Sequence, residues 1–435
     1  METLGVVMLD HNNLSTILNR GVSEIIVKDE FVSLLQEGKP LRLKMGFDPS
    51  RPDIHLGYVV ALRKLRALQE LGHRVILIVG DWTAQIGDPS GQSATRIMLS
   101  HEEVLANAKT YMEQFFKVVD KERTDTVFQS EWFGKFKLED VINLTSKFTV
   151  AQFLERDDFS IRFKANRPIA LTEFLYPLLQ AYDSVVIKSD VEFGGTDQKF
   201  NLLVGRELQA MMGQRPQQCF LNPLLVGTDG VRKRSQSFDN YIGLEDLPND
   251  MFGKLMSIAD NLIINYFEYL TDVADSELEE MTKAIEEESV NPMDLKKQLS
   301  LDITSQFHGS EKAFSAQSNF EKVVQRRLMP DDMPEIGFQV EGSGDQRRML
   351  FIRLDGTSDR TKLVKVTDQM EVSIFDLLFN TGLVSSISEA KRLVAQGAVE
   401  INHCKITEGV TPVHDGLTIK AGRRRFLRLI DFDAR

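Results

Sequence analysis

The residues best suited to chemistry stand where apolar strands give way to glycine-bearing turns. His55 and Gly57 follow an alternating strand pattern at 41–45 and precede an amphipathic helix pattern that stops at Gly72. An imidazole and a bare glycine backbone at a helix start suit an anionic group, because the first N–H groups of a helix are unpaired. Val75–Val79 adds a continuous apolar strand, so this stretch predicts a βαβ unit.

A second glycine-rich turn, Phe193–Gln198, contains Asp197 and precedes a helix pattern that ends at Gly213. The apolar run Val185–Ile187 before it predicts a buried strand. Two strand–turn–helix units predict a doubly wound parallel sheet of the dinucleotide-binding type, in which ligands bind beyond the carboxyl ends of the strands. An acidic residue such as Asp197 at this kind of turn commonly binds ribose hydroxyls.

Three polar side chains, Tyr176, Gln180 and Asp183, have the spacing i, i+4 and i+7 and therefore share one stripe of a predicted helix. The spacing alone leaves open a ligand pocket and a buried structural network. Asp88 lies in a Gly-Asp-Pro-Ser-Gly turn, which is either a surface turn or the site of a fixed carboxylate near the first βαβ unit. Arg96 follows on the same predicted loop.

Composition limits the class of protein. A net charge of −12 argues against indiscriminate binding of polyanions, yet residues 385–428 contain eight basic and four acidic residues, which allows a local basic face. Cys219 and Cys404 are far apart in sequence and have no metal-ligand spacing, which fits a reducing, cytoplasmic setting. We expect no secretion signal and no membrane span, since no apolar run approaches the roughly 20 residues that a span needs.

The pattern along the chain predicts an α/β protein with a Rossmann-like doubly wound sheet, an α-helical domain and a small α+β domain. The helical patterns, the two glycine-rich turns and the change in charge near the C-terminal end place the boundaries between them. The expected segments are a helical lead-in at 1–40, the Rossmann-like domain at 41–246 with a helical insertion at about 100–175, a helical domain at 247–334, a linker at 335–369 and the small domain at 370–435.

Taken together, these motifs resemble the tyrosyl-tRNA synthetases of class I, in the bacterial branch that carries a C-terminal S4-type RNA-binding module. The resemblance extends over essentially the whole chain and is carried by Gly46–Ser50, His55–Gly57, Gly87–Gly91, the Tyr176 stripe and Gly194–Gln198. It implies that L-tyrosine and ATP form tyrosyl-adenylate and pyrophosphate, and that the tyrosyl group then passes to tRNA(Tyr). It also implies a homodimer, and Mg²⁺ that arrives with the nucleotide without a dedicated protein metal site.

The resemblance assigns roles to particular side chains. In the tyrosine pocket, Asp183 would accept the phenol hydroxyl, which explains rejection of phenylalanine. The tyrosine-binding residues implied by the match are Asp88, Tyr176, Gln180, Asp183 and Gln198. Those that would bind ATP are Asp48, His55, Gly57, Gly195, Asp197 and Lys233, and those that would act on the phosphates in catalysis are Ser50, His55, Arg96 and Lys233. The residues implied to contact RNA are Lys391, Arg392, Arg423, Arg424 and Arg425.

The sequence departs from the family pattern at positions that face the phosphates. Tyr58 replaces the last histidine of the His-Ile-Gly-His signature, and Gln236 and Gln92 replace two lysines. Lys44 stands where another branch has tyrosine, and Arg234 is a substitute cation beside Lys233. Besides an active synthetase, these changes leave open a degenerate paralogue that binds tyrosine or RNA without aminoacylation, and an enzyme that activates a tyrosine analogue for biosynthesis.

Overall fold

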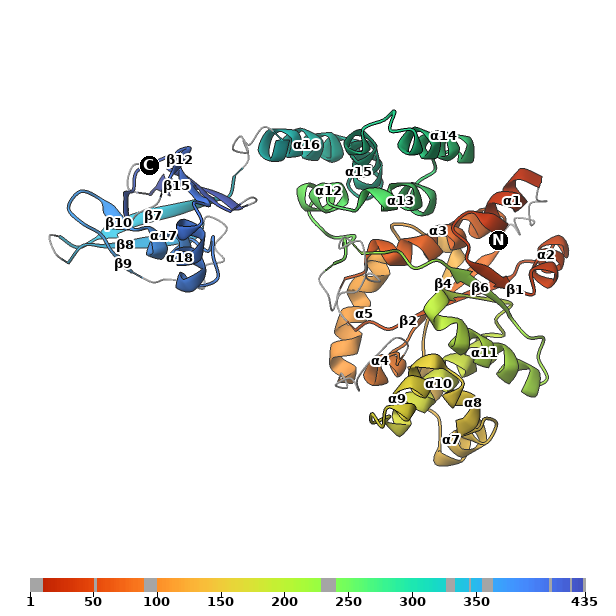
Figure 1. Ribbon diagram of the computed structural model, residues 1–435. Coiled ribbons are helices and arrows are strands. Elements are labelled where there is room, and N and C mark those ends of the chain that lie inside the picture. The colour runs from red at the N-terminus through yellow and green to blue at the C-terminus, as the bar shows by residue number, and fades with distance from the viewer. Residues whose placement is uncertain are drawn as a thin grey trace. The chain divides into compact units, whose positions relative to one another are not determined.

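The computed structural model divides into two compact units, Met1–Gln317 and Ser318–Arg435 (Figure 1). Each unit has its own hydrophobic core. The residues that the structure describes are 11–50, 53–89, 100–227, 240–325, 333–343, 346–353, 363–406, 409–422 and 425–432.

The first unit is built on a six-stranded sheet in which every neighbouring pair is parallel except β1 and β6. The chain runs outward from β2 through β3 to β4 on one side and from β5 to β6 on the other. The predicted doubly wound fold is therefore confirmed, and its switch point lies between β2 and β5. In order across the sheet, the strands are β1 (Glu24–Ile26), β6 (Gln218–Asn222), β5 (Val191–Gly195), β2 (Arg42–Phe47), β3 (Arg74–Val79) and β4 (Thr124–Phe128).

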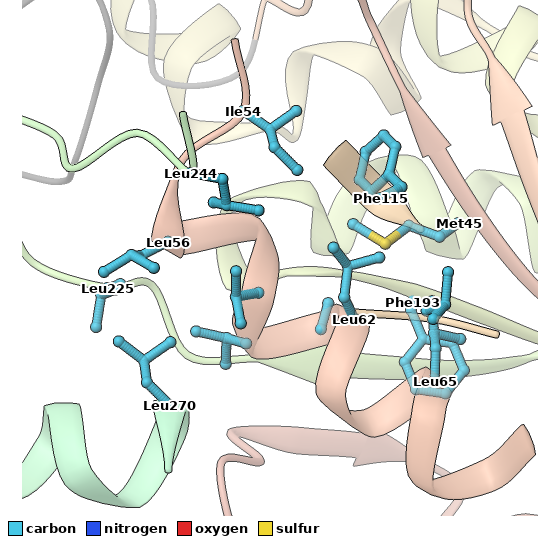
Figure 2. Close-up of a cluster of buried hydrophobic side chains, with 14 of the residues drawn as sticks. Met45, Ile54, Leu56, Leu62, Leu65, Phe115, Phe193, Leu225, Leu244 and Leu270 are labelled. Atoms are coloured by element: carbon cyan, nitrogen blue, oxygen red, sulfur yellow. The ribbon is translucent and has the colours of Figure 1, made fainter. Parts of the chain in front are cut away.

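Helix α3 (Leu56–Glu70) connects β2 to β3 and buries its apolar face. Figure 2 shows Leu62 and Leu65 of α3 in one cluster with Met45 of β2 and Phe193 of β5, all of them buried. At about 25 cal/mol per Å² of apolar surface, each such side chain contributes roughly 1.5–3 kcal/mol relative to exposure. This packing fixes the N-terminus of α3 over the ends of β2 and β5.

Three sequence predictions about elements of the sheet were wrong. Val185–Ile187 is not a strand but the end of α10 (Leu171–Ile187), because Lys188 takes a left-handed conformation that ends the helix before β5 begins. The lead-in is not wholly helical, since β1 pairs with β6 before α2 (Lys28–Gln36) starts. The stretch at 100–175 contains β4, an edge strand of the same sheet, among its helices. A single sequence gives no direct sign of such long-range pairing.

The other helices of this region cover the sheet and its edge. Helix α10 packs along α11 (Lys199–Met211), and a separate small core lies beneath the helices of the 138–164 stretch. The remaining elements are α1 (His11–Asn19), α4 (Thr83–Ile86), α5 (His101–Phe115), α6 (Ser130–Phe133), α7 (Leu138–Thr145), α8 (Val150–Leu154), α9 (Asp157–Lys164) and the short turn η2 (Thr196–Gln198).

Five helices follow the sheet, and the first four share its hydrophobic core through side chains such as Phe267, Leu270 and Leu299. They are α12 (Pro248–Met256), α13 (Ile263–Leu270), α14 (Asp275–Glu286), α15 (Pro292–His308) and α16 (Ser310–Phe320) (Figure 1).

Arg20 joins the N-terminal segment to the end of α13. Its guanidinium donates to the carbonyls of Glu268 and Thr271 at 2.9 Å each and also to the carbonyl of Val273. A cation at a helix C-terminus binds carbonyls that the helix leaves unpaired. We expect Arg20→Met to lower the free energy of unfolding by about 2–4 kcal/mol, measured by urea denaturation.

The matched control is Arg66→Met, which removes an exposed pair with Glu70 one helical turn away. That change should lower the free energy of unfolding by less than about 0.5 kcal/mol. Equal losses for the two variants would contradict the structural role of Arg20.

Among its described residues, the second unit contains a seven-stranded sheet, the π-helical segment Glu321–Gln325 and the α-helices α17 (Ile374–Asn380) and α18 (Ile387–Ala395). The predicted linker at 335–369 is corrected here, because β7 and β8 are central members of this sheet and β15 pairs with β7 in parallel. In order the strands are β12 (Cys404–Lys405), β11 (Val399–Ile401), β14 (Thr418–Ala421), β15 (Arg425–Asp431), β7 (Glu335–Glu341), β8 (Arg348–Arg353) and β9 (Val364–Lys365), and a separate pair is formed by β10 (Glu371–Ser373) and β13 (Val410–Pro412).

Within the ranges given above, no helix combines the length and the apolar character needed to cross a bilayer.

Candidate active site

The candidate site lies at the switch point, where the turn after β2 and the turn after β5 meet. The negative charges of Asp48, after β2, and Asp197, after β5, both raise the pKa of the Tyr58 hydroxyl. The two turns are therefore close enough to interact electrostatically with the same side chain. A Cβ added at Gly46 in β2 would meet nothing within 4 Å, so the backbone there borders open space. This is the position at which open α/β sheets bind their ligands.

Asp48 is held from two sides. The hydroxyl of Thr83 donates to its Oδ1 at 2.7 Å, and the hydroxyl of Tyr176 donates to its Oδ2 at 2.8 Å. A Cβ at Gly80 would overlap both Oδ1 of Asp48 and Oγ1 of Thr83, so only glycine permits their contact. Since the Tyr176 hydroxyl gives its proton to Asp48, its oxygen remains an acceptor toward a ligand.

Two tyrosines at the site stay neutral at physiological pH. Burial, followed by the nearby carboxylate of Asp48, raises the pKa of Tyr58 to about 12 and the pKa of Tyr176 well above its usual value. Tyr58 packs against His55 with ring centroids 4.9 Å apart. At this position the chain therefore presents an uncharged phenol in place of the histidine of the family signature.

His55 is the N-cap of α3. Its Nδ1 accepts the N–H of Gly57 at 3.1 Å, so in the neutral ring the proton is on Nε2. The tautomer is thus set by the helix, and the donor nitrogen Nε2 belongs to a ring that stands at the helix N-terminus. Ser50 is exposed on the same turn, and its backbone N–H donates to the carbonyl of Asp48 at 2.7 Å.

Asp183 is the most deeply buried carboxylate of the predicted tyrosine pocket, with 2% of its surface exposed. Gln129 Nε2 donates to its Oδ2 at 2.8 Å, and Trp132 Nε1 donates to its Oδ1 at 3.1 Å. Burial raises the pKa of Asp183 to about 7, while Lys44 and the two donors oppose the shift. Each oxygen of Asp183 thus accepts one hydrogen bond, and an ionised carboxylate oxygen can accept a second.

Gln180 is oriented by a neighbouring carboxylate. Its Nε2 donates to Oε1 of Glu192 at 3.0 Å. An ionised carboxylate only accepts hydrogen bonds, so the amide must turn its NH₂ group to Glu192 and its carbonyl oxygen away from it. A carbonyl acceptor, together with the Tyr176 oxygen and the Asp88 carboxylate near Tyr176, suits an ammonium group.

The last two residues of β5, Gly194 and Gly195, lie close to side chains of the turn that follows. A Cβ at Gly195 would lie 2.6 Å from Oδ1 of Asp197, and one at Gly194 would lie 2.8 Å from Oε1 of Gln198. The side chains of Asp197 and Gln198 therefore fold back over bare backbone. This brings a carboxylate to the turn that the sequence predicts to contact ribose.

Several predicted site residues lie outside the described residues, namely Arg96, Lys233, Arg423 and Arg424, together with the variant positions Gln92, Arg234 and Gln236. In the second unit, Lys391 and Arg392 are exposed on α18. Arg425 donates instead to Glu389 at 2.9 Å and to the carbonyl of Leu383 at 2.7 Å. Its guanidinium is thus partly engaged within the unit while its side chain is 40% exposed, and its contact with RNA stays a prediction.

Sequence reasoning missed the partners that give the site its shape. Gln129 and Trp132 follow β4, a strand that the sequence did not predict, and Thr83 lies on a short helix after β3. Glu192 stands one residue before the predicted turn, in a stretch to which the sequence analysis assigned no element. Only the polar character of Glu192 within an apolar strand could have drawn attention to it.

The family of the chain follows from comparisons with known proteins. The family model described as tRNA synthetases class I (W and Y) matches residues 36–325, and the S4 domain model matches 373–419. A Dehalococcoides mccartyi (strain CBDB1) protein named tyrosine–tRNA ligase is 55% identical over 96% of this chain and 99% of its own length. The chain belongs to the class I tRNA synthetases, and within them to the tyrosine–tRNA ligases.

A second relative belongs to the same family, and a solved structure has a similar fold. A tyrosine–tRNA ligase of Thermotoga maritima is 48% identical over 95% of this chain and 96% of its own. The crystal structure of an Archaeoglobus fulgidus tyrosyl-tRNA synthetase complexed with L-tyrosine superposes with a TM-score of 0.58 at 23% identity, covering 70% of this chain and 99% of that one. At this identity the superposition bears on the fold alone.

Proposed function

We propose that this chain activates L-tyrosine with ATP to give tyrosyl-adenylate and pyrophosphate, and then transfers the tyrosyl group to tRNA(Tyr). The observation that carries the proposal is the buried Asp183 carboxylate, held by Gln129 and Trp132 on the pocket side of α10. A phenol hydroxyl completes the hydrogen bonding of this carboxylate, whereas phenylalanine would leave it without that donor. A site of this kind discriminates by roughly 10⁴–10⁵-fold.

The first step is an in-line attack of the tyrosine carboxylate on the α-phosphorus of ATP, with pyrophosphate as the leaving group. Such a reaction depends on positioning and charge stabilisation more than on a protein nucleophile. The ammonium of tyrosine would meet acceptors from Gln180, Tyr176 and Asp88. On the nucleotide side, His55 Nε2–H and the N-terminus of α3 would receive a phosphate, and Asp197 would bind the ribose.

Mg²⁺ would accompany the nucleotide. Within the described ranges no three His, Cys, Asp or Glu side chains are grouped as metal ligands. Phosphate oxygens and water are the usual ligands of this ion in nucleotide sites. The ion would therefore be held mainly by ATP itself.

The test is ATP–pyrophosphate exchange with L-tyrosine, in the wild type and in a Gln92→Lys/Gln236→Lys double variant. Robust exchange by the wild type supports the proposal. Tyrosine binding without exchange, with activity restored in the double variant, would instead favour a paralogue that has lost its phosphate chemistry. Each phosphate-facing donor is worth roughly 10²–10³-fold in kcat, so the two outcomes are well separated. A panel of tyrosine analogues in the same assay tests the biosynthetic alternative.

For the tRNA step, we propose that Lys391 and Arg392 of α18 contact the RNA backbone. Replacing both with alanine should weaken tRNA binding roughly tenfold at moderate salt and lower the slope of log K against log salt by about 1–2, because fewer counterions are released. Tyrosine-dependent pyrophosphate exchange should not change. The measurement is a salt titration of tRNA binding.

The control is Lys420→Ala, because the Lys420 ammonium already pairs with Glu400 at 3.1 Å. An unchanged salt slope in the Lys391→Ala/Arg392→Ala variant would refute the assignment. Deleting residues 370–435 is a poorer experiment, since it would remove β15 from its pairing with β7.

We also propose a homodimer formed through the helices of the 138–171 stretch. Six large apolar side chains there are more than half exposed, although the same helices bury a small core of their own. Apolar surface on this scale is typical of an interaction site. The six are Leu138, Ile142, Val150, Ile161, Phe163 and Leu171.

We expect an Ile161→Asp/Phe163→Asp variant to sediment as a monomer at a concentration at which the wild type is a dimer, because a dimer interface would have to bury both charges unpaired. Phe314→Asp, at an exposed position on α16, should leave the sedimentation coefficient unchanged. A wild type that sediments as a monomer at all concentrations would refute the dimer.

A further inference from the structure

A buried ion pair lies between the two central strands of the sheet, and it includes the carboxylate that contacts the Gln180 amide. Lys44 of β2 and Glu192 of β5 approach to 2.8 Å between Nζ and Oε1, with 0% and 1% of their side chains exposed. The Lys44 ammonium also donates to the carbonyl of Gln180 at 2.7 Å and to the Ser184 hydroxyl at 2.6 Å. These three bonds use all three of its N–H groups, so Lys44 has no donor left for a substrate.

The Glu192 carboxylate is equally saturated. Its Oε1 accepts from Lys44 and from Gln180 Nε2 at 3.0 Å, and its Oε2 accepts from Ser184 at 3.2 Å and from Gln217. The carboxylate thus joins β2, α10 and the segment before β6 at one point. Of its four partners, Gln180 is the one that belongs to the tyrosine pocket.

We propose that Glu192, held in place by Lys44, is a positioning residue for the substrate amino group. The inference rests on the proposed function. Glu192 fixes the NH₂ side of the Gln180 amide, and Lys44 fixes the backbone carbonyl of the same residue. The Gln180 amide is therefore held in one of its two orientations, the one in which its carbonyl oxygen faces the ammonium of tyrosine.

Stability alone is a weak reason for such a pair. Burying two charges costs several kcal/mol, and well-packed apolar residues often replace a buried pair without loss. A fully satisfied polar network does restrict side chains to one arrangement. A second buried pair, Arg162–Glu173, has one member on the pocket helix and hydrogen-bonds to the backbone of Pro168 and Ala170. It therefore serves as a matched control.

The experiment compares two ligands that differ only in the amino group, L-tyrosine and 3-(4-hydroxyphenyl)propionate, by calorimetry on the full chain. In a Lys44→Met/Glu192→Met variant, the Kd for tyrosine should rise roughly tenfold to hundredfold, as expected for a lost hydrogen bond to a charged group. The Kd for the propionate reports any change in phenol binding that follows from removing the Lys44 and Glu192 charges near Asp183, and it should change much less than the Kd for tyrosine. Adding Gln180→Ala to this variant should cause no further loss for tyrosine, because the sites act as a unit.

The control variant, Arg162→Met/Glu173→Met, should leave the Kd of both ligands unchanged even if it lowers Tm. Equal losses for tyrosine and the propionate in the Lys44/Glu192 variant would overturn the inference, because they would show a merely structural role. If that variant does not fold, Glu192→Gln keeps the side-chain volume and should weaken tyrosine alone. A wild type that binds the propionate as tightly as tyrosine would overturn the amino-group subsite while leaving phenol recognition by Asp183 intact.

Discussion

Asparagine in place of Asp183 should lower kcat/KM for tyrosine in pyrophosphate exchange by roughly 10²–10⁴-fold. The carboxylate accepts from Gln129 Nε2 and Trp132 Nε1, one on each oxygen. An asparagine must point its NH₂ group at one of these donors, so one contact becomes repulsive and the acceptor for the phenol is weakened. The selectivity for tyrosine over phenylalanine should fall with it.

The same variant should leave kcat/KM for phenylalanine nearly unchanged, since that substrate never donates to Asp183. Glu139→Gln, at an exposed position on α7, is the control for loss of a carboxylate in the same region. It should leave kcat/KM for both substrates unchanged. A parallel loss for both substrates would mean that the variant damages the fold of the pocket, and phenol recognition would then need another residue.

The pKa of about 7 at Asp183 gives the wild type a pH signature. A protonated carboxyl would carry its one O–H on an oxygen that already faces an N–H donor and would be a weaker acceptor for the phenol, so tyrosine should bind the ionised form and its affinity should rise from pH 6 to pH 8. The contribution of Asp183 to folding stability changes with pH in the opposite direction to its contribution to tyrosine binding. The native pKa lies above the usual 3.8, so this group favours the folded state below about pH 4 and that contribution is lost as pH rises to about 7. Asp183→Asn should flatten the pH profile of tyrosine binding.

Alanine in place of Gly80 should reduce kcat for exchange by roughly 10²-fold, because a displacement of about 1 Å near a reacting centre has that cost. The added Cβ would overlap Oδ1 of Asp48 and Oγ1 of Thr83, so the hydrogen bond between them must break or the turn must move. Tyr176, which donates to the other oxygen of Asp48, would shift with it.

Gly253→Ala is the control for this change. A Cβ at Gly253 in α12 would meet nothing within 4 Å, and alanine favours a helix over glycine by roughly 0.5–1 kcal/mol. We expect a slightly higher Tm and unchanged exchange. Full activity in Gly80→Ala would show that the Asp48 network is not needed for catalysis.

The parts of the site that depend on local spacing were predictable from sequence. The Tyr176, Gln180 and Asp183 stripe required only a helix of 3.6 residues per turn, and α10 supplies it. The His55 turn required only a strand, a break and a helix. The family motifs then gave these residues roles that spacing alone could not.

The missing parts depend on contacts between distant segments. Gln129 and Trp132 reach Asp183 only because β4 joins the edge of the sheet beside β3. Val185–Ile187 is β-branched and apolar, yet its packing on α11 keeps it helical, since tertiary contacts override a weak local preference. Sequence reasoning assigned Glu192 no role, because its four partners come from three other segments of the chain.

The place of β15 within its sheet has a consequence for synthesis on the ribosome. Residues 335–341 and 348–353 emerge early but cannot complete their sheet until 425–431 arrive, because β15 connects β7 to β14. The Rossmann-like unit needs nothing beyond its own residues and can fold as the chain grows. We therefore expect nascent chains halted before residue 425 to contain a folded catalytic unit. Their β7 would have an unpaired edge that proteases can cleave and chaperones can bind.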